Sequence, residues 1–161
     1  MNKSWIANGF TAANALFGGL SIMMSISGEY HVAAICILIA MAADAFDGKV
    51  ARALGTAGPM GVELDSLSDD ISFGVAAGAL MYSYQLRELG ALGFIPCALL
   101  GAFCAFRLAR FNVKVTSVHG YFEGLPCPTV GVIIACYVLS GVKIWNWLAM
   151  VCVLVLAVLM V

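Results

Sequence analysis

Six long apolar stretches separated by short polar breaks make up the chain, and this pattern leaves few ways to fold. A helix needs about 20 apolar residues to cross the hydrocarbon core of a bilayer. Of this sequence 63% is apolar and 11% is charged, whereas roughly a quarter of a soluble domain is charged. The sequence therefore predicts an all-α, polytopic membrane protein and excludes an ordinary soluble domain.

The polar breaks predict a bundle of six transmembrane helices that forms a single domain over residues 1–161. The predicted spans are 7–27, 32–53, 61–85, 89–112, 128–141 and 144–161. Six Lys or Arg residues fall on the side of the amino terminus, against only Arg87 and Lys143 on the other side, which predicts that the first side is cytoplasmic. The chain ends on Leu159-Met160-Val161 without an interfacial anchor, from which we expect a truncated C-terminus or further spans.

Charge and cysteine content narrow the possible partners. The net charge of −1 provides no basic field that would attract nucleic acid, so no nucleic-acid partner is expected. The cysteines form no C-x-x-C pair and lie in or beside apolar runs, so we expect small buried hydrophobes rather than disulfides or zinc ligands. They are Cys36, Cys97, Cys104, Cys127, Cys136 and Cys152.

Acidic residues are concentrated in one short part of this apolar sequence. They are Asp44, Asp47, Glu63, Asp65, Asp69 and Asp70. An ionised side chain at mid-membrane costs about 2.5–3.5 kcal/mol, so these groups should face a wet cavity, pair with cations or hold metal. The first two aspartates are three residues apart, and Asp65 and Asp69 are four apart, so each pair shares one helical face. The short connection near 55–59 predicts that the two helices are antiparallel neighbours and bring four carboxylates together.

Four carboxylates in a low dielectric repel each other unless a cation neutralises them. A cluster of oxygen ligands without Cys or His favours Mg²⁺ or Mn²⁺, with Ca²⁺ as a further candidate. Four shared carboxylates suit two ions better than one. Asp70 and Glu63 lie off the face of Asp65 and Asp69, and we expect them to make structural polar contacts.

Small residues and one cation adjoin the aspartates. Gly48 and Gly61 leave space beside the helix backbone, Ala51 keeps the next turn small, and Arg52 offers two donors to phosphate oxygens. Together with the acidic residues they predict a pyrophosphate site, in which metal ions bridge the phosphates. The alternative interpretation is that the small residues serve ordinary helix packing in the membrane.

These residues reproduce the pattern D-x2-D-G-x2-A-R-x8-G-x3-D-x3-D from Asp44 to Asp69, with eight fixed identities over 26 positions. The chain thereby resembles the CDP-alcohol phosphotransferase family. Within that family it is most similar to the bacterial and archaeal phosphatidylserine synthases, the CDP-diacylglycerol–serine O-phosphatidyltransferases. The segments that carry this second resemblance are 6–14 with Gly18, 63–67, 72–76, 107–112 and 124–128.

The resemblance implies a six-helix membrane bundle that usually forms a homodimer, with its site open to the cytoplasm. It implies two divalent cations, CDP-diacylglycerol as the membrane-lipid donor, and L-serine, whose hydroxyl displaces CMP. Asp44, Asp47 and Asp65 would hold one ion, and Asp44, Asp65 and Asp69 the other. Asp69, the last on its face, is also the expected general base.

The resemblance also assigns residues to the two substrates. The expected nucleotide and phosphate side consists of Asn8, Thr11, Asn14, Gly48, Ala51, Arg52 and Gly61. For the three residues of the first helix, hydrogen bonding within the bundle is the alternative. Arg107 and Arg110 are the candidates for binding the serine carboxylate, with anchoring at the membrane interface as their alternative role.

Two other functions fit parts of the sequence. A sister enzyme would use glycerol 3-phosphate or inositol phosphate as acceptor, but a phosphate-bearing acceptor should require a denser basic cluster than Arg107, Arg110 and Lys114. A divalent-cation transporter would need polar residues that continue to the far side of the membrane, where the connections offer only Glu29 and Glu88.

Overall fold

The computed structural model describes residues 4–54, 58–114 and 124–161, and in residues 4–7, 51–54, 59 and 114 the backbone alone. Every regular element in these ranges is helical. The elements are α1 (Ser4–Ile26), α2 (Tyr30–Leu54), α3 (Pro59–Asp69), η1 (Asp70–Val75), α4 (Ala76–Tyr84), η2 (Leu86–Leu89), α5 (Ala91–Lys114), α6 (Cys127–Leu139) and α7 (Asn146–Met160). The all-α prediction is confirmed for the described residues.

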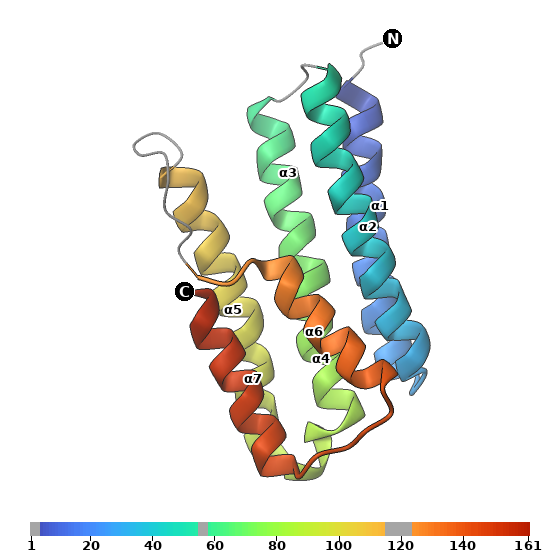
Figure 1. Cartoon of the computed structure of the whole chain (residues 1–161), viewed down its shortest axis with the longest axis vertical. Coiled ribbons are helices and arrows are strands. Elements are labelled where there is room, and N and C mark those ends of the chain that lie inside the picture. The colour runs from blue at the N-terminus through green and yellow to red at the C-terminus, as the bar shows by residue number, and fades with distance from the viewer. Residues whose placement is uncertain (1–3, 55–57, 115–123) are drawn as a thin grey trace.

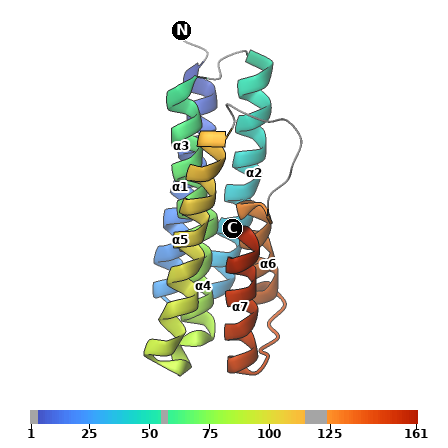
Figure 2. The same cartoon turned by 90° about the vertical axis from the view of Figure 1, so that its left-hand side faces the viewer.

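The helices form an elongated bundle. Helix α1 packs along α2, α5 packs on α7, and α2 packs on α6. Figures 1 and 2 show that α1, α2 and the rod from α3 to α4 run along the long axis, while α6 and α7 occupy only the half away from the N-terminus. The other half therefore consists of the outer parts of α1, α2, α3 and α5.

Within the described residues, three helices are long and apolar enough to cross a bilayer: Asn8–Ile26, Tyr30–Val50 and Ala91–Val113. The apolar helices Cys127–Leu139 and Asn146–Met160 have 13 and 15 residues. At 1.5 Å per residue they extend about 20 and 23 Å, less than the roughly 30 Å of hydrocarbon. The structure thus supports three of the six predicted spans.

The rod formed by α3, η1 and α4 contains a π-helical turn, η1, immediately after Asp69. Helical backbone angles at Asp69 and Ala76 make α3, η1 and α4 continuous. In η1, Ser72 and Phe73 are buried against the glycines Gly18 of α1 and Gly131 of α6, where an added Cβ would lie 2.9 Å from the Ser72 Cα and 2.7 Å from the Phe73 ring. The turn is thus closely packed on two sides, and this packing fixes the helix from which Asp69 projects.

All six cysteines are free thiols. Four are buried as expected, but Cys136 and Cys152 are exposed on the outer faces of α6 and α7. The prediction of buried cysteines is therefore wrong for these two. In an apolar helix an outward-facing thiol meets lipid as readily as a small apolar side chain does, so the sequence pattern does not distinguish the two positions.

Candidate active site

Three of the predicted carboxylates form a compact cluster. One oxygen from each of Asp44, Asp47 and Asp65 lies within 4.8 Å of the others. Asp47 is buried, while Asp44 and Asp65 are half-buried. The prediction that α2 and α3 bring their aspartates together is confirmed for this set.

Asp69 lies beside the cluster rather than in it. Its side chain contacts that of Asp44, which also contacts Asp65. Asp69 is 8% exposed, so it is the deepest acidic residue of α3. Its position at the inner edge of the cluster fits a group that meets a reacting atom as well as one that completes a metal site.

Helix α1 packs against both of the helices that carry the carboxylates. Among the described residues, α2 and α3 themselves make little direct contact. The two helices run antiparallel, as expected (Figure 1), and they meet through their aspartate side chains.

Helix α1 also supplies hydrogen-bond donors to the carboxylates. The Thr11 hydroxyl donates to Asp47 Oδ2 at 2.6 Å, and the Asn14 amide donates to Asp69 Oδ1 at 3.0 Å. Both donors are buried. Thr11 and Asn14, predicted for the nucleotide side, thus make the hydrogen bonds of our alternative interpretation and orient two aspartates.

The donor set fits divalent metal ions. The ligand atoms are carboxylate oxygens, which Mg²⁺ and Mn²⁺ prefer. Asp65 Oδ1 and Asn14 Oδ1 are buried and have no hydrogen-bond partner among the described residues. A buried oxygen without a partner carries a substantial desolvation penalty, which a bound cation would relieve.

The remaining predicted nucleotide-side residues are placed only in part. An added Cβ at Gly61 would lie 3.9 Å from Asn8 Oδ1, so these two residues are adjacent across α1 and α3, while the space beside Gly48 is open. The side chains of Ala51 and Arg52 lie outside the described residues.

The two candidate arginines of α5 point to different partners. Arg107 Nη1 donates to Cys127 Sγ at 3.8 Å, and its buried Nε has no hydrogen-bond partner in the part of the chain that the structure describes. Arg110 Nη1 donates to the Val161 carbonyl at 3.1 Å. Because Cys127 also lies near Asp69, Arg107 is the arginine on the side of the aspartates.

Our sequence reasoning missed several polar contacts that frame the site. The Asn112 amide donates to Ser66 Oγ at 3.0 Å and ties α5 to α3, and the Ser72 hydroxyl donates to the Asn14 carbonyl at 2.9 Å. Asp70 is half-buried beside Cys104, and Glu63 is exposed. All four residues that make the first two contacts lie in the segments that carried the family resemblance, so those segments were the available signal.

Comparison with known proteins agrees with this geometry. The family model described as CDP-alcohol phosphatidyltransferase matches residues 4–159. The chain belongs to the CDP-alcohol phosphatidyltransferase family. Members of this family generally use divalent metal ions, and the acidic cluster is suited to hold them. Together with its apolar helices, the family identifies the chain as an integral membrane protein.

Several similar proteins carry names of enzymes that act on serine. The chain is 36% identical over 137 residues to the CDP-diacylglycerol–serine O-phosphatidyltransferase of Helicobacter pylori, covering 84% of this chain and 58% of the relative. It is 40% identical over 130 residues to the archaetidylserine synthase of Methanothermobacter thermautotrophicus, covering 80% and 55%. The serine O-phosphatidyltransferase of Bacillus subtilis is 38% identical over 122 residues, covering 75% and 68%. The chain thus spans little more than half the length of the first two relatives.

Proposed function

We propose that this chain transfers the phosphatidyl group of CDP-diacylglycerol to the hydroxyl of L-serine and releases CMP. The observation that carries the proposal is the cluster of Asp44, Asp47 and Asp65 oxygens within 4.8 Å, with Asp69 beside it. Such a cluster suits a metal-bound pyrophosphate. The names of the relatives point to serine as the acceptor.

In the proposed reaction the serine oxygen forms a bond to the phosphorus that carries diacylglycerol, and the bond from that phosphorus to the oxygen of CMP breaks. Asp69 accepts the proton of the serine hydroxyl as general base. The hydrogen bond from Asn14 holds the Asp69 carboxylate in position. Divalent ions held by Asp44, Asp47 and Asp65 would neutralise the pyrophosphate and the departing CMP.

We assign the serine carboxylate to Arg107. This guanidinium has a buried Nε–H that finds no hydrogen-bond partner within residues 4–54, 58–114 and 124–161, and it lies near Cys127, on the side of Asp69. A single arginine matches a carboxylate, whereas glycerol 3-phosphate or inositol phosphate would bring a dianionic phosphate that calls for more cations. Serine is therefore the acceptor that these residues support best.

Several broader features belong to the same proposal. The site would hold two divalent ions, with Asp44 and Asp65 shared and Asp69 as a ligand of the second. The chain would form one domain of six membrane spans with its site facing the cytoplasm, supported by the excess of Lys and Arg on the side of the amino terminus. It would act as a homodimer.

The test is an acceptor-dependent release of CMP. Purified protein in detergent is given CDP-diacylglycerol, Mn²⁺ or Mg²⁺ and labelled L-serine, and both CMP and labelled lipid are measured. Glycerol 3-phosphate and inositol phosphate are supplied in parallel reactions, and a CDP-activated ether lipid replaces the donor in another. We expect serine alone to stimulate release of CMP. Stimulation by a phosphate-bearing acceptor and not by serine would overturn the assignment.

A further inference from the structure

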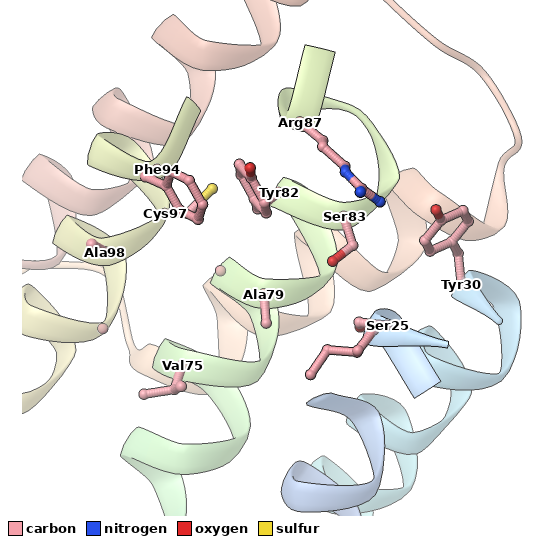
Figure 3. Close-up of a pocket in the computed structure, with 13 residues that line it drawn as sticks. Ser25, Tyr30, Val75, Ala79, Tyr82, Ser83, Arg87, Phe94, Cys97 and Ala98 are labelled. Atoms are coloured by element: carbon pink, nitrogen blue, oxygen red, sulfur yellow. The ribbon is translucent and has the colours of Figure 1, made fainter. Parts of the chain in front are cut away.

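A second site lies at the other end of the bundle, away from the aspartates. A groove of about 700 Å³ opens there between α1, α4 and α5 (Figure 3). Small residues line its length, and they are Gly78, Ala79, Ala98 and Gly101. The rings of Tyr82 and Phe94 stack with centroids 4.1 Å apart and form one wall. The groove is therefore an apolar trough, and the small side chains along it leave it open.

The mouth of the groove is polar and carries one charge. Figure 3 shows the Arg87 guanidinium over the mouth, between the side chains of Ser83 and Tyr30. Arg87 is exposed, and it is the only charged residue among the 13 that line the groove. The neighbouring carboxylate of Glu88 accepts a hydrogen bond from the Asn146 amide of α7 instead. No carboxylate lines the groove, so Arg87 gives its mouth a positive charge.

The depth of the groove matches one leaflet of a bilayer. Its lining follows the continuous helix from Val75 to Ser83, eight residues along, which at 1.5 Å per residue is about 12 Å, and Arg87 lies beyond the end of α4, in η2. Half of the hydrocarbon core is about 15 Å thick. A groove whose mouth lies at the membrane–water boundary would therefore end near the middle of the bilayer.

We propose that this groove binds an anionic phospholipid of the leaflet opposite the aspartate cluster. The phosphodiester lies on Arg87 with the hydroxyl groups of Ser83 and Tyr30 as further donors, and one acyl chain lies along the trough past Ala79 and Ala98. A basic residue at the mouth of an apolar groove between membrane helices is a combination that binds lipid head groups.

Charge favours an anionic over a zwitterionic head group. None of the lining residues is acidic, so a choline or ethanolamine ammonium would find no carboxylate in the groove. The glycerol of phosphatidylglycerol brings no such charge and leaves the phosphodiester to pair with Arg87. The ligand is therefore a structural lipid, bound independently of the proposed reaction.

Native mass spectrometry of the purified chain, titrated with phosphatidylglycerol or phosphatidylcholine, tests the proposal. We expect phosphatidylglycerol to bind more tightly, with the tightest site weakened about tenfold by Arg87→Gln, since a charge-assisted hydrogen bond is lost. Ala98→Leu, which fills the trough, should weaken binding of the same lipid. The matched controls are Lys143→Gln, which removes the other cation of this end, and Ala102→Leu, one helical turn along α5 and outside the lining.

The outcomes separate cleanly. Loss of binding in Arg87→Gln and Ala98→Leu, with both controls within about twofold of the parent, supports the site. Equal losses in Arg87→Gln and Lys143→Gln would mean general attraction of anionic lipids and would overturn it. So would a dimer that Ala98→Leu dissociates, because the groove would then hold a second copy of the chain. Serine-dependent release of CMP decides none of these outcomes.

Discussion

The two ends of the bundle treat their polar groups in opposite ways. At the end where η2 meets α7, Gln85 is 2% exposed, yet its amide donates to the Ile144 carbonyl and to Asn146, while its oxygen accepts from the Tyr137 hydroxyl. The Ile144 amide in turn donates to the Tyr137 hydroxyl. This far-end network (Gln85, Tyr137, Ile144, Asn146 and Glu88) leaves none of its buried side-chain atoms without a partner among the described residues.

Around the aspartates, by contrast, several buried polar atoms have no hydrogen-bond partner among the described residues. Of the five buried side-chain atoms without a partner in the described residues, four belong to Asn14, Asp65, Asp70 and Arg107, and all four residues surround the site. Since a buried polar group without a partner costs about 1–3 kcal/mol, the fold tolerates a loss here that it avoids at the other end. The far-end network holds helices together, whereas the unpaired atoms lie around the aspartates to which we assign the reaction.

The first prediction tests whether an aspartate of the cluster binds metal or stabilises the fold. Asp65→Asn should lower serine-dependent turnover about 10³-fold, because it removes a ligand of ions that stabilise charge worth several kcal/mol in the transition state. Without metal, the thermal midpoint of the variant should equal or exceed that of the parent, because one of several repelling carboxylates is gone.

Metal supplies the second measurement on Asp65→Asn. At about 100 times its dissociation constant, Mn²⁺ should stabilise the parent by about 2.7 kcal/mol and raise its thermal midpoint, with a much smaller rise in the variant. Asp70→Asn is the matched control, since it removes a neighbouring carboxylate outside the cluster. A variant that unfolds earlier without metal and responds normally to Mn²⁺ would count against a metal site.

The second variant tests whether Asp69 acts as a general base or only as a metal ligand. Asp69→Asn should reduce turnover by about 10² to 10⁴, the usual contribution of a general base, while binding of CDP-diacylglycerol falls much less. Turnover is measured as serine-dependent CMP release, and binding by titration calorimetry with the same donor. A loss of binding as large as the loss of turnover would make Asp69 a ligand alone.

The far-end network should show the reverse pattern. Gln85→Leu leaves the Tyr137 hydroxyl and the Asn146 side chain with fewer partners, so we expect a loss of about 2–3 kcal/mol in stability and a thermal midpoint lower by several degrees. Turnover per folded molecule should stay close to that of the parent. Val142→Ala, on the exposed loop beyond the network, is the control for a change at this end. A severe loss of turnover at low temperature, where Gln85→Leu remains folded, would link the two ends.

The sequence predicted some of these features and not others. Apolar runs and polar breaks placed the helices within a few residues, for example 7–27 against Ser4–Ile26 and 128–141 against Cys127–Leu139. Helical spacing correctly predicted the grouping of Asp44, Asp47 and Asp65, because residues three or four apart share a face, while Asp69 lies beside that cluster. The π-helical turn was not predictable in this way, since it depends on close packing against Gly18 and Gly131 from distant segments.

Long-range pairings account for the other differences. Thr11 and Asp47 are 36 residues apart, and Asn14 and Asp69 are 55 apart, so no local pattern shows which polar residue of α1 meets which carboxylate. The same holds for Arg107 and Arg110, whose spacing on one helix predicts a shared face. Their guanidinium groups nevertheless reach Cys127 at the start of α6 and Val161 beyond the end of α7.

This divergence of the two arginines gives the smallest predicted effect. Arg107→Gln should raise the KM for serine about tenfold and leave the KM for CDP-diacylglycerol nearly unchanged, because its unpaired Nε–H lies on the side of Asp69. Arg110→Gln, three residues away on the same helix, is the matched control and should change the KM for serine less. Both constants are obtained by varying one substrate at saturation of the other. Equal effects on both substrates would assign Arg107 to the stability of the α5–α6 contact, and a larger effect of Arg110→Gln would move the serine carboxylate to that residue.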